Sequence, residues 1–356
     1  MDTSPAFSNS IRLTPRQWRG VAIFTIAFVL VTPTLWNQIE PFPLEPDYRM
    51  PYEISQDYWL FERYAALAAE HFDVCVLGDS VIWGEYVTRQ QTLTHYLNRK
   101  AGKERFANLG LEGAYPLALV GLVQHYAGPI RDRRVIVHCN PLWMSSPQKD
   151  LQEDSKDPIL HPRLIPQFGV PRYREEITKR LGVLIEQRTP FLQWTNHLQQ
   201  AYYSQSDMPG WTLEHPYDNP LRQLTKRLPP SSNELRAAQQ PWYQGRTQLN
   251  YEWFDPAKDR SLQWEAFQET VHILQGRGNH VFVVVGPFNE HMLTDESKKR
   301  HGKVKDMIAS WLTAQQIPHV VAELLPSEHY ADASHPLPEG YARLADMLWA
   351  DAKFRE

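Results

Sequence analysis

The chain has 356 residues, of which 42% are hydrophobic and 12% aromatic, an ordinary composition for a globular protein that buries a core. Its 37 basic and 41 acidic side chains leave a formal net charge of -4, so the sequence lacks the excess of basic charge by which proteins bind nucleic acid. Two cysteines, Cys75 and Cys139, are too few for a disulfide framework, and we expect both to be buried thiols.

An uncharged apolar run at residues 20–36, GVAIFTIAFVLVTPTLW, is typical of a membrane-spanning helix, and Trp18 and Trp36 bracket it where aromatic rings favour the membrane interface. Arginines precede this run and carboxylates follow it. We therefore expect residues 1–19 to stay in the cytoplasm and the rest of the chain to lie outside it. A cleaved signal peptide and a buried globular helix are the alternatives; the length of the run and the lack of small residues in PTLWNQ favour a signal anchor.

Residues 37–51 contain four prolines among acidic and aromatic residues. Proline resists helix formation, so this segment is predicted to be an extended stalk. The folded domain is predicted to run from residue 52 to residue 356, and no internal repeat appears within it.

Short apolar runs alternate with segments of helical spacing through this domain. Strands are predicted in FDVCVLGDS, RFANLG, RRVIVHCN, HVFVVVGPF and IPHVVAEL. Helices are predicted at residues 90–101, 116–127, 262–275, 298–315 and 338–352. The alternation predicts an α/β fold with a doubly wound parallel sheet of about five strands, covered on both faces, whose ligands bind beyond the carboxyl ends of the strands.

Residues 145–251 do not follow this alternation and are interpreted as an insertion into the domain. They are rich in Pro, Gln, Arg and Trp and contain helical patches at 174–186 and 222–228, but no convincing strand. Tryptophans in and just after this region are expected to pack against the sheet, with stacking on sugar rings as the less favoured alternative: Trp194, Trp211, Trp242 and Trp253.

Ser80 follows the first predicted strand, in LGDS, so its hydroxyl is expected at the carboxyl edge of the sheet. A serine hydroxyl becomes a nucleophile only when a base takes its proton. The sequence DASH near the C-terminus offers that base in His335, and Asp332 is spaced to accept a hydrogen bond from the other imidazole nitrogen. Helix capping is the alternative role for Ser80, and capping or turn formation for the other two residues.

Two further strand ends supply candidate donors for the oxyanion of acyl transfer. They are the backbone amide of Gly113, in NLGLEGA, and the side-chain amide of Asn140, in HCNP; their alternative roles are those of ordinary turn residues. Further residues near the strand ends are candidates for substrate contact: Trp83, Trp143, Asn289 and His291. The histidines and cysteines show no spacing typical of a metal site, so neither a metal nor another cofactor is expected.

These blocks resemble those of the SGNH hydrolase superfamily, the GDSL-like esterases and lipases, over most of residues 72–351 apart from the insertion. The resemblance implies a three-layer α/β/α, flavodoxin-like fold. It also implies a triad of Ser80, Asp332 and His335, and an oxyanion hole formed by Ser80, Gly113 and Asn140.

The sequence departs from the superfamily pattern at three positions. Val81 stands where the fourth letter of GDSL is leucine, and His138 and Pro141 replace the usual glycine and aspartate around Asn140. These changes keep the asparagine donor and alter its surroundings.

The expected function is that of a serine esterase or O-acyltransferase that works through an acyl-serine intermediate. Its expected substrate is an extracytoplasmic cell-envelope glycan that carries ester-linked acyl groups, with acetyl as the favoured acyl group. The chain is similar to the single-span SGNH proteins that accompany membrane-bound O-acyltransferases in polysaccharide acetylation, which implies such an enzyme as a partner. Two alternatives stay open: a lipase or thioesterase acting on lipid acyl esters, and a non-catalytic scaffold of the same fold that assists a membrane O-acyltransferase.

Overall fold

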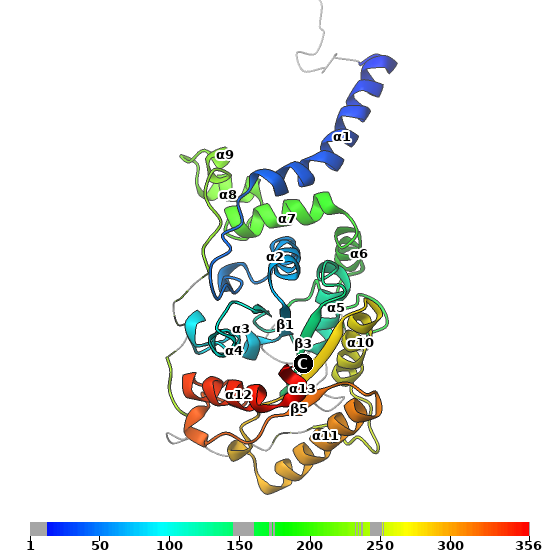
Figure 1. The fold of residues 1–356 in the computed structure, drawn as a ribbon. Coiled ribbons are helices and arrows are strands. Elements are labelled where there is room, and N and C mark those ends of the chain that lie inside the picture. The colour runs from blue at the N-terminus through cyan, green and yellow to red at the C-terminus, as the bar shows by residue number, and fades with distance from the viewer. Residues whose placement is uncertain are drawn as a thin grey trace, which may run out of the picture.

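The structure is a computed structural model that describes residues 13–144, 160–170, 173, 175–231, 233, 235, 238–242, 251 and 253–355. Five parallel strands form one sheet in the order β2-β1-β3-β4-β5 (Figure 1). The strands are β1 (Val74–Gly78), β2 (Phe106–Gly110), β3 (Arg134–Cys139), β4 (His280–Val285) and β5 (His319–Val321). Each strand coincides with one of the predicted apolar runs, so the prediction of a parallel α/β sheet of about five strands is confirmed.

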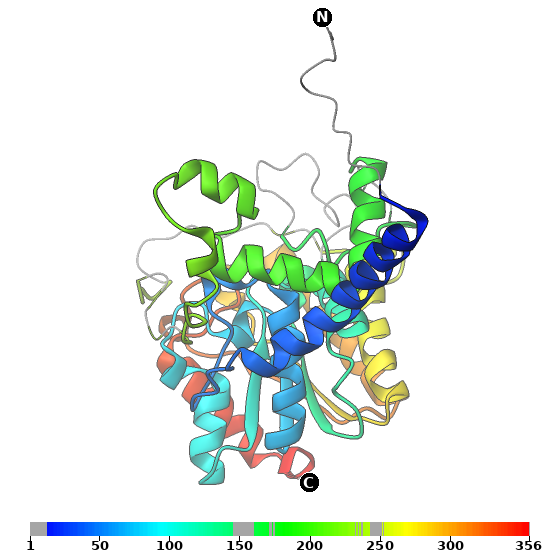
Figure 2. The same ribbon diagram turned by 90° about the horizontal axis from the view of Figure 1, so that it is seen from above.

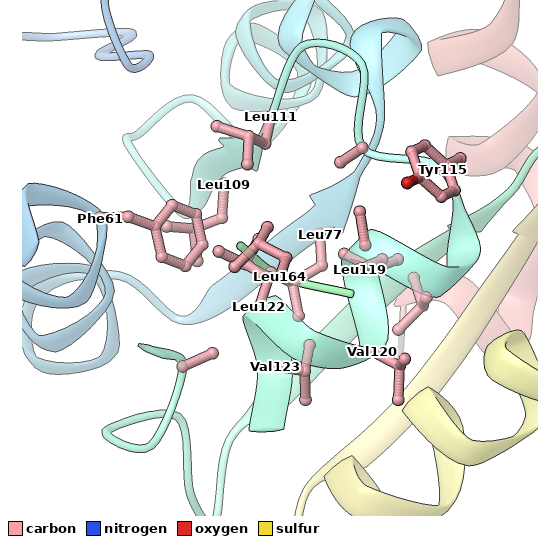
Figure 3. Close-up of a cluster of buried hydrophobic side chains, with 14 of the residues drawn as sticks. Phe61, Leu77, Leu109, Leu111, Tyr115, Leu119, Val120, Leu122, Val123 and Leu164 are labelled. Atoms are coloured by element: carbon pink, nitrogen blue, oxygen red, sulfur yellow. The ribbon is translucent and has the colours of Figure 1, made fainter. Parts of the chain in front are cut away.

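Helices pack on both faces of this sheet, because alternate strand side chains point to opposite sides. Cys75 and Leu77 of β1 belong to one hydrophobic cluster, and Val74 and Val76 to a second. The helices of the first cluster include α2 (Tyr58–His71), α5 (Pro116–Tyr126), α10 (Leu262–Gly276) and α11 (Asp295–Ala314). Those of the second include α4 (Leu93–Ala101), α12 (Pro338–Ala350) and α13 (Ala352–Arg355). Figure 3 shows side chains of α2 and α5 gathered around Leu77 in the first cluster.

The N-terminal helix α1 (Pro15–Ile39) is long and apolar enough to cross a membrane, the one such helix in the described part of the chain. It begins at a capping box: the Thr14 side chain accepts a hydrogen bond from the backbone of Gln17, whose side chain accepts one from the backbone of Thr14. The helix is therefore longer at both ends than the apolar run at residues 20–36, because apolar composition alone does not mark the caps.

Residues 40–51 are not a free stalk. They contain no helix, as their prolines predict, but they pack along the domain, and Tyr48, Arg49 and Met50 are buried. The Arg49 guanidinium lies 4.1 Å from the ring of Trp83 and donates hydrogen bonds to the backbone carbonyls of Trp83 and Gly84. The proline content correctly predicted the absence of helix in this segment. Its burial could not be predicted from composition, because it depends on contacts with residues distant in the sequence.

A buried polar cluster fixes the end of α1 to the domain. The Glu40 carboxylate pairs with Arg63 of α2 and accepts hydrogen bonds from the side chains of Trp36, Tyr202 and His197. His197, on α7 (Pro190–Tyr202), also donates from Nδ1 to Asp57 over 2.7 Å. Burial alone would raise the pKa of Glu40 and lower that of His197, but their pairing outweighs burial and moves these pKa values to about 2 and about 9. Both groups are therefore charged at neutral pH.

The described residues of the insertion form helices and no strand, in agreement with the prediction. These helices are α6 (Ile177–Glu186), α7, α8 (Met208–Glu214) and α9 (Pro220–Gln223), and they gather at the end of the domain from which α1 rises (Figures 1 and 2). The helix predicted at residues 222–228 is only the single turn of α9, which begins earlier, behind the Asn219 cap. All four tryptophans expected to pack rather than stack are buried: Trp194, Trp211, Trp242 and Trp253.

Candidate active site

The candidate site lies where the order of the sheet reverses. From β1 the chain passes to β2 on one side and later to β3 on the other, so the crossovers diverge between β1 and β3. In parallel sheets, ligands bind at such a switch point, outside the carboxyl ends of the strands. Ser80 follows β1 directly, and Asn140 follows β3.

Ser80 is the first residue of the one-turn helix α3 (Ser80–Trp83) and is not its cap. The N-cap is Asp79, whose carboxylate accepts the backbone hydrogen of Val81 over 3.1 Å. The capping role considered for Ser80 is therefore wrong, and its hydroxyl has a different partner. α3 approaches β2 so closely that a Cβ at Gly110 would lie 2.3 Å from the backbone nitrogen of Trp83, which explains the glycine at the end of that strand.

The three residues of the expected triad form one hydrogen-bonded series. Ser80 Oγ lies 2.7 Å from His335 Nε2, and His335 Nδ1 lies 2.8 Å from both carboxylate oxygens of Asp332. Asp332 also accepts the backbone hydrogens of Ser334 and His335, each over 3.0 Å, so the loop orients its own carboxylate. Ser80 and Asp332, which are 252 positions apart in the sequence, thus contact the same imidazole ring.

The charges around His335 keep this ring basic. Burial alone would lower the pKa of His335, but the carboxylates of Asp332, Asp79 and Glu85 outweigh burial and raise it. The pKa of Asp332 shifts the other way, because the charge and hydrogen bonds of His335 outweigh its burial and lower it. A basic imidazole beside a serine hydroxyl, held by an ionised carboxylate, is the arrangement that activates serine as a nucleophile.

Asp79 organises the other side of the site. One oxygen accepts from Val81 and lies 3.0 Å from His138 Nδ1; the other accepts from the side-chain nitrogens of Asn140 and Trp143, each over 2.7 Å. The carboxyl is buried, which alone would raise its pKa, but His138 and these donors outweigh burial and lower it. Asp79 therefore acts as a buried anion that positions three side chains next to Ser80.

His138 sits between two acceptors. Its Nδ1 faces the Asp79 carboxylate, and its Nε2 lies 3.0 Å from the backbone carbonyl of Gly286 after β4. His138 thus links the ends of β1, β3 and β4.

The two candidate oxyanion donors lie at the expected edge of the sheet. Asn140 gives one hydrogen of its side-chain amide to Asp79, and its oxygen accepts the backbone hydrogen of Leu142. Gly113 follows β2 with φ of +70°, the left-handed region that favours glycine. The carbonyl of its neighbour Glu112 lies 2.6 Å from His161 Nε2, so a histidine of the insertion braces this loop.

The four candidates for substrate contact divide into two kinds. Trp83 is in the core, with its indole nitrogen donating to the Met50 carbonyl, and Asn289 is buried, with its amide donating to the backbone of Asp332. His291 is half-buried, with Nε2 at 3.0 Å from the Leu325 carbonyl. Each of these three thus has a partner within the protein, and their contact with a substrate stays a prediction.

Two half-buried aromatic side chains, Trp143 and Tyr86, contact residues of the candidate site. Trp143 is half-buried, tied to Asp79, and its ring lies 5.9 Å from that of Tyr115. Tyr86 is half-buried and meets His335 edge to face at 5.4 Å. The sequence analysis did not single out Tyr86, although its position six residues after Ser80 placed it on the loop that leaves α3.

Among the described residues, no group of three or more His, Cys, Asp or Glu side chains could hold a metal ion. Cys75 and Cys139 are free and buried, and burial raises the pKa of Cys75 to about 12. In comparisons with known proteins, the chain matches no protein-family model and no curated sequence.

Proposed function

We propose that this chain is a membrane-anchored serine esterase or O-acyltransferase with the three-layer, doubly wound architecture of the SGNH hydrolases. The observation that carries the proposal is the hydrogen-bonded series from Ser80 Oγ through His335 to Asp332, located at the switch point of a parallel sheet. Asp79 caps α3, which leaves the Ser80 hydroxyl available to the imidazole.

In the acylation step, Ser80 Oγ adds to the carbonyl carbon of an acyl ester while His335 Nε2 takes the hydroxyl proton. The backbone amides of Ser80 and Gly113 and the second amide hydrogen of Asn140 stabilise the oxyanion. Collapse of this intermediate breaks the bond between the acyl carbon and the alcohol oxygen. The alcohol leaves with the proton from His335, and the acyl group stays on Ser80.

Deacylation repeats the sequence with a second hydroxyl compound. Water or a sugar hydroxyl gives its proton to His335 and attacks the acyl-serine, and Ser80 recovers a proton as the acid or the new ester departs. The proposed substrate is an acetylated cell-envelope glycan, and a membrane-bound O-acyltransferase is the proposed partner. Both proposals rest on the sequence resemblance together with the apolar helix α1.

The proposed location of the domain is outside the cytoplasm, on the far side of the membrane from the arginines that precede the apolar run. A reporter fused to the C-terminus tests this directly. A periplasmic reporter such as alkaline phosphatase is expected to be active there, and activity of a cytoplasmic reporter alone would reverse the assignment.

The activity test uses the full chain purified in detergent, with Ser80→Ala as the matched control. p-Nitrophenyl esters of acetate and of longer acids are supplied with and without an oligosaccharide acceptor. Turnover of the acetyl ester that disappears in Ser80→Ala supports the proposal. Preference for long acyl chains would favour a lipase or thioesterase, and a chain that neither turns over esters nor reacts with a fluorophosphonate at Ser80 would be a scaffold.

A further inference from the structure

The second half of α1 is packed on the domain and the first half is not. The Phe28 ring lies 5.8 Å from that of Phe191, at the start of α7, and Trp36 lies 5.9 Å from Trp194. Pro33, between them, is buried. Figure 1 shows α1 lying against α7, and Figure 2, seen from above, shows α1 passing across the end of α7 beyond which α6 lies.

This packing leaves too little free helix to cross a bilayer. Residues 15–27 precede the contact with Phe191 and extend about 20 Å at 1.5 Å per residue, whereas the hydrocarbon core is about 30 Å thick. If α1 spans the membrane, the bilayer must therefore reach past Phe28. The start of α7 and its neighbour α6 are then at the membrane surface.

α6 carries an apolar face that no described part of the chain covers. Ile177, Leu181 and Ile185 are 55%, 46% and 57% exposed, and their spacing of four residues places them in one row along the helix. Thr178 and Gly182 lie beside this row and are also exposed, so this face carries no charge.

The rest of α6 is held in place by contacts with the insertion. The Arg180 guanidinium lies 4.7 Å from the Phe168 ring and 5.4 Å from the Tyr173 ring, and Glu186 pairs with Arg163. On the side of the helix away from the apolar row, Lys179 pairs with Glu175 over 3.1 Å. The apolar row thus belongs to a helix fixed in orientation, with its charged residues on the other sides of the helix and none in the row, as in helices that lie in a membrane interface.

We propose that the row formed by Ile177, Leu181 and Ile185 lies in the interfacial layer of the lipid bilayer beside α1. The domain would then be held against the membrane by two elements, a spanning helix and an interfacial helix, and the insertion is the part that meets the lipid. This inference rests on the proposed membrane span of α1, and the bilayer itself is the occupant of the α6 face.

The test places a nitroxide label at single positions of the full chain in vesicles of phosphatidylcholine with a minority of phosphatidylglycerol. Cys75 and Cys139 are buried, so an introduced cysteine is the reactive one. Leu181→Cys is the test position, Ile26→Cys on α1 the lipid control, and Lys258→Cys the water control, because the Lys258 side chain is 79% exposed. Collision rates with oxygen, which concentrates in lipid, and with a water-soluble nickel chelate report the environment of each label.

The expected result is that the labels at 181 and 26 both collide preferentially with oxygen, and the label at 258 with the nickel chelate. A label at 181 that behaves like the one at 258, while the label at 26 is in lipid, would overturn the interfacial role of α6 and keep the span. A water-exposed label at 26 would overturn the span itself. Thermal melting of each labelled variant checks that it remains folded.

Discussion

Replacing His197 by glutamine is expected to remove a pH-dependent contribution to stability. His197 is fully buried between the carboxylates of Glu40 and Asp57, with nitrogen–oxygen distances of 2.9 Å and 2.7 Å. A glutamine side chain can donate to one of these carboxylates but carries no charge and does not titrate. The variant therefore tests whether the imidazolium holds the end of α1 against the domain.

The magnitude follows from the pKa of His197, which is about 9 in the folded protein against an ordinary 6.5. This difference corresponds to about 3 kcal/mol of unfolding free energy, since each tenfold change in proton affinity is worth about 1.4 kcal/mol. Because the folded state binds this proton more tightly, the contribution is complete below pH 6.5 and is lost as the pH rises to 9.

The assay is urea unfolding of the full chain in detergent, monitored by tryptophan fluorescence. The pH runs from roughly 6 to 9.5, which covers the ordinary and the raised pKa of His197. Wild type should lose more unfolding free energy across this range than His197→Gln, by about 3 kcal/mol. His335 titrates with the same sign in both proteins, so its contribution cancels in the difference. Equal losses in the two proteins would refute the assignment of a charged His197.

Three further variants test the site and its support. Ser80→Ala should lower ester turnover by several orders of magnitude, with little change in melting temperature because Asp79, and not Ser80, caps α3. Near-normal turnover would contradict the assignment of Ser80 as the nucleophile. Wild-type activity should rise with pH as His335 loses its proton, with an apparent pKa above 6.5. Asp332→Asn should reduce the rate by about 10⁴-fold and shift this rise in activity to lower pH. A pH profile that does not shift in Asp332→Asn would exclude the pairing of Asp332 with His335. Gly110→Ala should lower the melting temperature, because the alanine methyl group would clash with the backbone of Trp83. An unchanged melting curve would show that α3 can move away from β2 without loss of stability.

The strands and the triad could be predicted because their signals are local. Each strand is a short apolar run, and the serine and the Asp-His pair stand directly at the ends of such runs or before a helix. A parallel sheet brings its carboxyl ends to one edge, so the meeting of Ser80 and His335 followed from the topology. The helix at residues 58–71 carries a regular apolar pattern as well, at Tyr58, Phe61, Tyr64 and Ala68, and could have been found from it.

The hydrogen-bond network behind Ser80 could not be predicted, because it depends on the direction of individual side chains. Asp79 reads in the sequence as one letter of a motif, but its carboxylate turns inward to hold His138, Asn140 and Trp143. The packing of Trp36 against Trp194 joins residues of the apolar helix and the insertion, and neither segment contains a sign of the other. Such contacts arise from the three-dimensional arrangement alone.

The segment that leads from α1 into the domain supports the backbone behind Ser80. Arg49 donates hydrogen bonds to two carbonyls at the last turn of α3, and the Met50 carbonyl accepts the indole hydrogen of Trp83, so the backbone behind Ser80 is held by the segment that follows α1. A protease that cut between residues 41 and 47 would release a domain that keeps these contacts but loses Glu40 of the buried cluster. A shortened chain starting at residue 52 would lack both these contacts and Glu40. The turn that carries Ser80 would then have to keep its conformation without the segment that now packs against it.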